Sequence, residues 1–350
     1  MDSESHSDHF DKRELQHPQG LKAKSEEEIT NSFYHSKLGI LFSMIVLFGN
    51  GIHPIINNSR PIGLDSLNFA WLMGLFELLC VIPLFILEKR KIFKNHIQNE
   101  KYRGEKAQNL RKNAWKLFVT IGIFFSIATV FYTTGLSIAG SINGSIATKT
   151  APIFALFIGA LLLHEKITKK QLGLTLFMLF GLYYQSTKGT MLLEEMNIGF
   201  LMLCITTFLW NFSHALSKPF LQSRAISTIE IIFYRSLLVF ISVLGYSIAQ
   251  TGFDSVISVI LNPYFIFFGF LMGGTYFLMH FCWYKSITTI NLSLASALVI
   301  PSPVITTIVA IAMQQEILHG YQIIGMIIMV AGLYALLLEK MKVQPIENNA

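Results

Sequence analysis

Apolar runs of about 20 residues, each long enough as an α-helix to cross a hydrocarbon core of about 30 Å, alternate with short polar joints along most of the chain. We therefore expect an all-α integral membrane protein. The pattern predicts ten membrane-spanning helices, near residues 38–57, 67–87, 115–136, 142–163, 170–186, 197–217, 228–249, 263–285, 292–314 and 321–338.

The composition agrees with this pattern. Of the 350 residues 52% are hydrophobic and only 14% are charged, whereas a soluble domain has about 25% charged residues. The three cysteines, Cys80, Cys204 and Cys282, lie inside apolar runs, which indicates buried thiols rather than disulfides. The sequence contains no spacing typical of a metal site, and we expect neither a metal nor a cofactor.

The basic residues are distributed asymmetrically about the predicted spans. If both termini are cytoplasmic, 23 of the 27 Lys and Arg residues lie in tails and inner loops, Arg60 and Lys188 lie in outer loops, and Lys149 and Arg235 lie within spans. This bias predicts a multi-pass plasma-membrane protein with both termini cytoplasmic, and it explains the net charge of +6 without nucleic acid. The joint 88–116 holds ten basic and three acidic residues and is expected to lie against anionic lipid headgroups.

The chain contains an internal repeat. A shift of 161 positions superposes Asn50 on Asn211 and His53 on His214. A shift of 151 gives seven identities in 33 positions, which pair Pro152 with Pro303, Glu165 with Glu316, Gln171 with Gln322, Met178 with Met329, and Gly181-Leu182-Tyr183 with Gly332-Leu333-Tyr334. Because five is odd, two five-helix halves enter the membrane from opposite sides and form an inverted repeat.

This repeat defines the expected domains. The halves comprise residues 37–187 and 188–340, and residues 341–350 form a short cytosolic tail. Residues 1–36 lack the apolar core of a signal peptide, and we expect a disordered cytosolic tail there.

A proline followed thirteen residues later by a glutamate ends both the fourth and the ninth span, and a span containing Gly-Leu-Tyr follows each time. In these features, over roughly residues 38–338, the chain resembles the drug/metabolite transporter superfamily, within it the proteins with two EamA-type domains. The resemblance implies a secondary transporter of a small metabolite, amino acid or drug-like solute that works by alternating access, and we expect an exporter coupled to protons. It also implies that the first four helices of each half line the solute path.

Three ionisable residues lie inside predicted spans, where each costs about 2.5 to 3.5 kcal/mol on insertion scales. Glu77, near the middle of its span, is either a proton-coupling carboxylate or a protonated core acid bonded to a neighbouring helix. Lys149 and Arg235 lie about two turns from opposite faces, where they either bind solute anions or extend to the nearer headgroups. Lys149 also resembles a lysine of nucleotide-sugar and sugar-phosphate relatives, at a different spacing from the proline, so an anion-metabolite exchanger is the alternative transporter.

Histidines and aromatic residues are further candidates for the solute path. His53 and His214 each follow an asparagine, Asn50 or Asn211, by three positions, which places each pair on one helix face. His280 lacks such a counterpart and is a weaker candidate for a proton relay. Aromatic side chains can stack on a planar solute, although belts at the headgroup level account for many membrane aromatics; the candidates are Trp71, Tyr132, Trp210, Tyr276 and Trp283.

Other residues suggest hinges and packing. Pro152, Pro301 and Pro303 break helical hydrogen bonds and are either hinges or simple kinks. Gly140, Gly144, Gly181 and Gly332 allow helices to approach closely. Glu165 and Glu316 end spans, where each is expected to cap the next helix.

The sequence supports enzymatic and non-transport functions less well than transport. His164-Glu165 lacks the second histidine of a zinc protease, and neither a nucleophile elbow nor a phosphate-binding loop is present. The sequence therefore indicates no enzyme. A receptor or scaffold is the alternative from another class, and it predicts a sealed interior in which Glu77 and Arg235 pair with each other.

Overall fold

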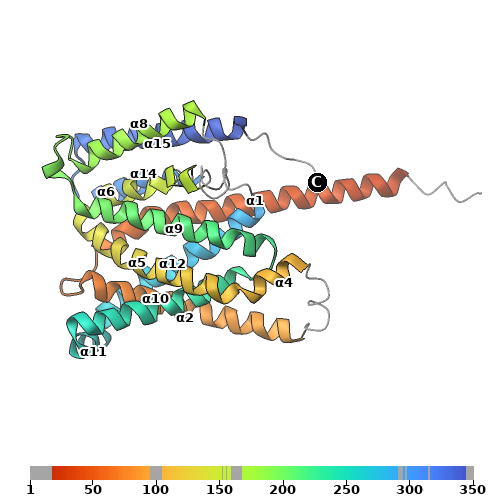
Figure 1. Cartoon of the computed structure of the whole chain (residues 1–350), viewed down its shortest axis with the longest axis horizontal. Coiled ribbons are helices and arrows are strands. Elements are labelled where there is room, and N and C mark those ends of the chain that lie inside the picture. The colour runs from red at the N-terminus through yellow and green to blue at the C-terminus, as the bar shows by residue number, and fades with distance from the viewer. Residues whose placement is uncertain are drawn as a thin grey trace, which may run out of the picture.

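The computed structural model describes residues 18–94, 105–151, 153–154, 156–158, 168–290, 295, 298–313 and 316–343 (Figure 1). Every regular element within these residues is a helix. The helices are α1 (Pro18–Asn58), α2 (Ser66–Lys94), α4 (Glu105–Lys112), α5 (Ala114–Ala139), α6 (Ser141–Ala147), η1 (Thr148–Thr150), α8 (Lys169–Ser186), η2 (Leu193–Glu195), α9 (Ile198–Gln222), α10 (Thr228–Thr251), α11 (Phe253–Leu261), α12 (Pro263–Thr289), α14 (Ser302–Ala312) and α15 (Gly320–Val343).

Within the described residues, seven helices contain stretches long and apolar enough to cross a membrane, each beginning within one residue of a predicted span: Lys37–Asn58, Ser66–Arg90, Ala114–Ala139, Ile198–Gln222, Thr228–Thr251, Pro263–Thr289 and Gly320–Glu339. The prediction of a helical, multi-pass membrane protein is therefore confirmed. The other three predicted spans fall on shorter or less apolar described helices, namely α6 with η1, α8, and α14.

Two segments differ from the prediction. Helix α1 begins at Pro18, so residues 18–36 are helical where a disordered tail was expected. This segment contains three glutamates and two lysines, which favour helices even without an apolar stretch. Helix α11 occupies a joint for which the apolar pattern predicts no helix, and its nine residues are too short for a span.

Polar residues in the joints explain why several helices begin where they do. Asn262 accepts hydrogen bonds from backbone N–H groups in the first turn of α12. Thr168 with Gln171 begins α8, and Ser227 with Glu230 begins α10, each as a capping box in which two side chains satisfy two backbone donors. These caps fix helix ends at the joints between spans.

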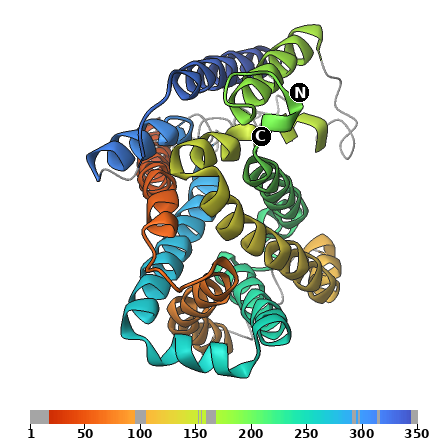
Figure 2. The same cartoon turned by 90° about the vertical axis from the view of Figure 1, so that its left-hand side faces the viewer.

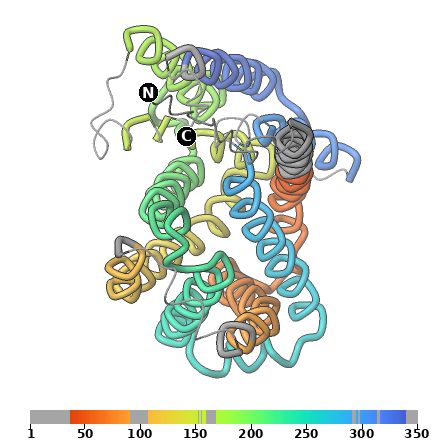
Figure 3. The backbone as a smooth tube through the Cα atoms, turned by 90° about the vertical axis from the view of Figure 1, so that its right-hand side faces the viewer, coloured from red at the N-terminus to blue at the C-terminus, as the bar shows by residue number. Residues whose placement is uncertain are grey.

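Helices from the two parts of the chain pack against each other in pairs. The pairs are α1 with α12, α2 with α10, α5 with α9, α6 with α14, and α8 with α15. Seen from either end, α8 and α15 lie side by side at one edge of the bundle, while the other pairs form its body (Figures 2 and 3). Each pair joins residues before 187 to residues after 197.

The predicted packing and hinge residues have distinct positions. A Cβ atom on Gly181 would lie 2.4 Å from Ile328, and one on Gly332 would lie 2.4 Å from Met178, so both glycines lie at the close contact of α8 with α15. Pro303 occupies the first turn of α14 and Pro301 precedes it. Both prolines therefore begin a helix instead of kinking one, because the first turn has no intrahelical N–H bond to lose. Pro152 and Glu165 lie outside the described residues.

Candidate functional site

A buried ion pair joins α2 to α10. Arg235 Nη2 donates to Glu77 Oε1, and the two side chains are 0% and 1% exposed. The backbone of α12 lies close by, because a Cβ on Gly273 would be only 2.9 Å from the Glu77 nitrogen. This approach is possible only with glycine, and it places the side chains of α12 beside the ion pair.

Two of those α12 residues, together with a ring from α5, surround the pair. His280 Nδ1 lies 3.7 Å from Glu77 Oε1 and 2.9 Å from the carbonyl oxygen of Tyr276. Since a carbonyl only accepts, the Nδ1 of His280 carries the hydrogen. The guanidinium of Arg235 lies 4.3 Å from the ring centre of Phe125 and 5.6 Å from that of Tyr276, within the range of cation–π attraction.

Four aromatic rings from four helices continue the site. His53 of α1 lies between Tyr132 of α5 and Tyr276 of α12, with both ring centres 5.4 Å away and both ring pairs stacked. The hydroxyl of Tyr132 is 2.9 Å from His53 Nδ1. Trp210 of α9 is the fourth ring, and its centre lies 5.0 Å from that of Tyr132 and 6.2 Å from that of Tyr276. Helices far apart in the sequence thus contribute to one set of rings.

His214 of α9 lies at the side of this set. Its ring is 6.3 Å from that of His280, 5.9 Å from Phe125 and 5.4 Å from Tyr284. We call the eight residues His53, Glu77, Tyr132, Trp210, His214, Arg235, Tyr276 and His280 the central cluster.

Several polar atoms of the central cluster are buried without a hydrogen-bond partner among the described residues. They are His53 Nε2, Trp210 Nε1, His214 Nδ1, Arg235 Nε, Arg235 Nη1 and the hydroxyl of Tyr276. Buried polar atoms in proteins are nearly always bonded to protein or to water, so each exception requires a reason. Such a concentration in one cluster is typical of a site that receives polar ligands.

A model of the EamA-like transporter family matches residues 37–187 and 197–338. The chain belongs to this family. No curated protein matches the sequence. Among solved structures, a chain described as "Crystal structure of protein" is similar at 15% sequence identity with a TM-score of 0.49, over 87% of this chain and 99% of that one.

All eight residues of the central cluster of this EamA-like transporter were candidates from the sequence, and five further candidates lie outside it. Lys149 is half-buried in η1 and forms no salt bridge among the described residues. Trp283 packs near Val46 and Cys282 in a separate apolar cluster. Asn211 donates to the carbonyl oxygen of Thr207 on its own helix, and no hydrogen bond joins Asn50 to the central cluster among the described residues. Sharing a helix face with a histidine was therefore not enough to give either asparagine a hydrogen bond within the cluster.

Two aromatic contacts of the site were missed, and one predicted aromatic residue lies elsewhere. Phe125 and Tyr284 touch the cluster, but a single Phe or Tyr in an apolar span gives no signal of its own. The 151-residue shift superposes Phe125 on Tyr276, and this correspondence could have identified Phe125. Trp71 donates to Asn68 Oδ1 and has no ring contact with the cluster.

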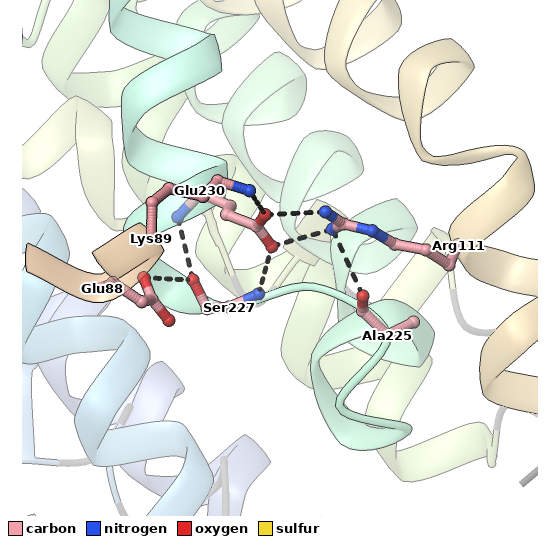
Figure 4. Close-up of polar contacts among 6 residues, drawn as sticks. All are labelled: Glu88, Lys89, Arg111, Ala225, Ser227 and Glu230. Carbon is pink, nitrogen blue, oxygen red and sulfur yellow. Dashed lines mark hydrogen bonds and ion pairs between the residues drawn. The ribbon is translucent and has the colours of Figure 1, made fainter. Parts of the chain in front are cut away.

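A second group of charges joins α2 and α4 to the first turn of α10 (Figure 4). Arg111 donates both terminal nitrogens to Glu230, each at 2.8 Å, and Lys89 Nζ lies 2.8 Å from the same carboxylate. The hydrogen bond to Glu230 raises the pKa of Arg111 above its ordinary value. Glu230 is therefore already neutralised by two residues of the first half.

Proposed function

We propose that this EamA-like protein is a proton-coupled secondary transporter whose ten spans form two inverted five-helix repeats, residues 37–187 and 188–340. The helix pairs support this arrangement. Rotation about a two-fold axis that exchanges the halves would map three helix pairs onto themselves: α2 with α10, α6 with α14, and α8 with α15. The same rotation would map the pair α1 with α12 onto the pair α9 with α5. Inverted repeats of this kind move a solute past a site near the membrane midplane by alternating access.

The observation that carries the proposal is the Glu77–Arg235 ion pair inside the central cluster. Breaking a buried pair leaves an uncompensated charge, so the pair constrains when the two halves can separate. Since α2 belongs to one half and α10 to the other, exchange of a proton or a solute at Glu77 loosens a contact between the halves. This couples binding to conformational change.

The same pair argues against the anion exchanger. Glu77 neutralises Arg235, and Lys149 lies outside the cluster, so the site has no excess positive charge. A neutral or zwitterionic solute fits this balance better than a phosphorylated one. We expect export from the cytoplasm across the plasma membrane, with both termini cytoplasmic and the inward proton gradient as the driving force.

A receptor or scaffold also predicts that Glu77 and Arg235 pair in a sealed interior, and the pairing is observed. The unpaired polar atoms favour transport, because a permanently sealed core gains nothing from leaving the donors of Trp210, Tyr276 and Arg235 unsatisfied. The family match favours transport for an independent reason.

The test is transport by purified protein in proteoliposomes. A metabolite extract is added outside, a pH gradient is imposed in either direction, and the contents of the vesicles are analysed by mass spectrometry. We expect at least one solute to accumulate above protein-free vesicles, and its accumulation to depend on the direction of the gradient. Equal contents with and without protein would contradict transport, and gradient-independent equilibration would contradict proton coupling.

A further inference from the structure

The unpaired atoms of the central cluster are mainly hydrogen-bond donors. Trp210 Nε1 and the Nε and Nη1 atoms of Arg235 carry hydrogens and cannot accept, while the hydroxyl of Tyr276 can do either. The free nitrogens of His53 and His214 donate or accept according to tautomer. The strongest acceptor, Glu77, already receives a hydrogen bond from Arg235. A solute that satisfies this site must therefore supply acceptors.

The rings of the cluster favour a flat solute. The imidazole of His53 is itself a planar heteroaromatic ring, and it lies stacked between Tyr132 and Tyr276. Trp210 is tilted by 50° and 49° against the two tyrosines, so its indole presents a further aromatic surface beside them. Offset stacking of such rings is favourable and depends little on the identity of the ring.

A positively charged solute is disfavoured at the same place. Aromatic rings attract cations, but the guanidinium of Arg235 already lies over Phe125 and Tyr276. A second cation there is repelled by Arg235 and competes with it for Glu77.

We propose that the transported solute is an uncharged planar heteroaromatic compound, of the purine or pyrimidine type, whose oxygen and nitrogen acceptors receive hydrogen bonds from Trp210, Tyr276 and Arg235. This inference rests on the proposed transport function and names its substrate class.

The first test uses the proteoliposomes and the metabolite extract, supplemented with equal concentrations of hypoxanthine, uracil, phenylalanine, leucine and tetramethylammonium. We expect hypoxanthine, uracil or a related heteroaromatic solute to accumulate above protein-free vesicles. Accumulation of only phenylalanine, leucine, tetramethylammonium or other solutes without such a ring overturns the substrate class and leaves transport intact. If no solute accumulates, the proposed function fails and the substrate class fails with it.

The second test removes single donors while keeping an aromatic ring at each position. Trp210→Phe and Tyr276→Phe should each raise the half-saturating concentration of the accumulated solute about three- to tenfold, the usual effect of one hydrogen bond. Trp115→Phe and Tyr264→Phe are the matched controls, since these residues are 62% and 72% exposed and lie at the starts of α5 and α12, more than three turns from Tyr132 and Tyr276. Unchanged half-saturation in both cluster variants overturns the assignment of the donors.

A competition experiment with the parent protein avoids any folding defect of the variants. Benzimidazole has the fused bicyclic shape of hypoxanthine but lacks the carbonyl oxygen and the six-membered-ring nitrogens. We expect it to inhibit uptake of labelled hypoxanthine at least about fivefold less strongly than unlabelled hypoxanthine does, because the donors of the site are left unpaired. Equal inhibition by the two compounds contradicts the role of the acceptors.

Discussion

Glu316 and Ser141 are 175 positions apart, yet the Glu316 carboxylate accepts a hydrogen bond from the backbone N–H of Ser141, and a second from the N–H of Ile142 at 3.1 Å. The sequence predicted that Glu316 caps the helix that follows it, whereas it caps α6 of the other half. Asn143 reinforces this contact, because its side-chain oxygen accepts from Gln185 and from Gln322, each at 3.1 Å. A carboxylate of the second half thus stabilises the start of the fourth predicted span of the first half.

We expect Glu316→Gln to lower the thermal stability of the detergent-solubilised protein, since an anion at a helix N-terminus contributes about 0.3 to 1 kcal/mol. Gly140→Ala should also destabilise, because Gly140 has φ +83° and a Cβ there would lie 3.2 Å from Glu316 Oε2. Gly173→Ala is the control, as a Cβ on Gly173 meets nothing within 4 Å. If Gly140→Ala melts at the same temperature as Gly173→Ala, the backbone at Gly140 is not constrained as described.

The second prediction concerns coupling at Glu77. Glu77→Gln should abolish accumulation driven by a pH gradient while solute exchange without a gradient persists, because glutamine cannot carry the proton. Uptake and exchange are measured in the same vesicles, so that a folding defect lowers both. Gradient-driven accumulation at the parent level would remove Glu77 from proton coupling.

The ion pair itself predicts non-additive stability. Arg235→Gln alone leaves Glu77 buried and unpaired, a loss of about 3 to 5 kcal/mol. The double variant Glu77→Gln with Arg235→Gln should be less destabilised than the sum of the two single variants, because it leaves no unpaired charge. Thermal unfolding of the four proteins gives the cycle, and additive losses would show that the two side chains do not depend on each other.

At the other charged group, Glu230→Gln should destabilise more than Lys89→Gln. Glu230 is 3% exposed and binds two cations and the backbone N–H of Ser227, whereas the Lys89 side chain is 40% exposed, so solvent screens its contribution. The loss of stability in Arg111→Lys should lie between the losses in Glu230→Gln and Lys89→Gln, since lysine retains the charge but loses the bidentate geometry. Equal melting temperatures for Glu230→Gln and Lys89→Gln would argue that this group contributes little.

The predicted orientation is tested by cysteine accessibility in a background without the three native cysteines. Asp65 lies in a joint predicted to be outside and Lys112 in one predicted to be inside, and both side chains are exposed. An impermeant thiol reagent on intact cells should label Asp65→Cys and leave Lys112→Cys unmodified until the membrane is permeabilised. Labelling of Lys112→Cys in intact cells would reverse the orientation.

The sequence predicted much of the helical framework because spans and caps are local. Runs of apolar residues and capping residues such as Asn262 and Ser227 identify helix starts within a residue or so. These local patterns do not predict which residues of different helices come into contact, since Glu77 and Arg235 are 158 positions apart in the sequence. Both were predicted because charges in spans are rare, whereas Phe125 is one of 29 phenylalanines and is distinguished in the sequence only by its correspondence with Tyr276 in the repeat.

The last prediction separates the two transport hypotheses, and it compares Lys149 with Arg235. An anion exchanger needs the charge of Lys149, so Lys149→Gln should then weaken solute affinity from one face of the membrane. In the structure Lys149 is half-buried, has no salt bridge among the described residues and lies outside the central cluster. We therefore expect Lys149→Gln to change half-saturation less than twofold from either face. Arg235→Gln should raise the half-saturating concentration by about tenfold or more, because a donor group of the site is lost together with the charge balance of Glu77.

The affinity for the solute is measured from each face in oriented vesicles for both variants, with Lys188→Gln as the control, since Lys188 is 57% exposed at the side chain. A large effect of Lys149→Gln from one face, with little effect of Arg235→Gln, would favour an anionic solute and contradict the neutral site proposed for the central cluster.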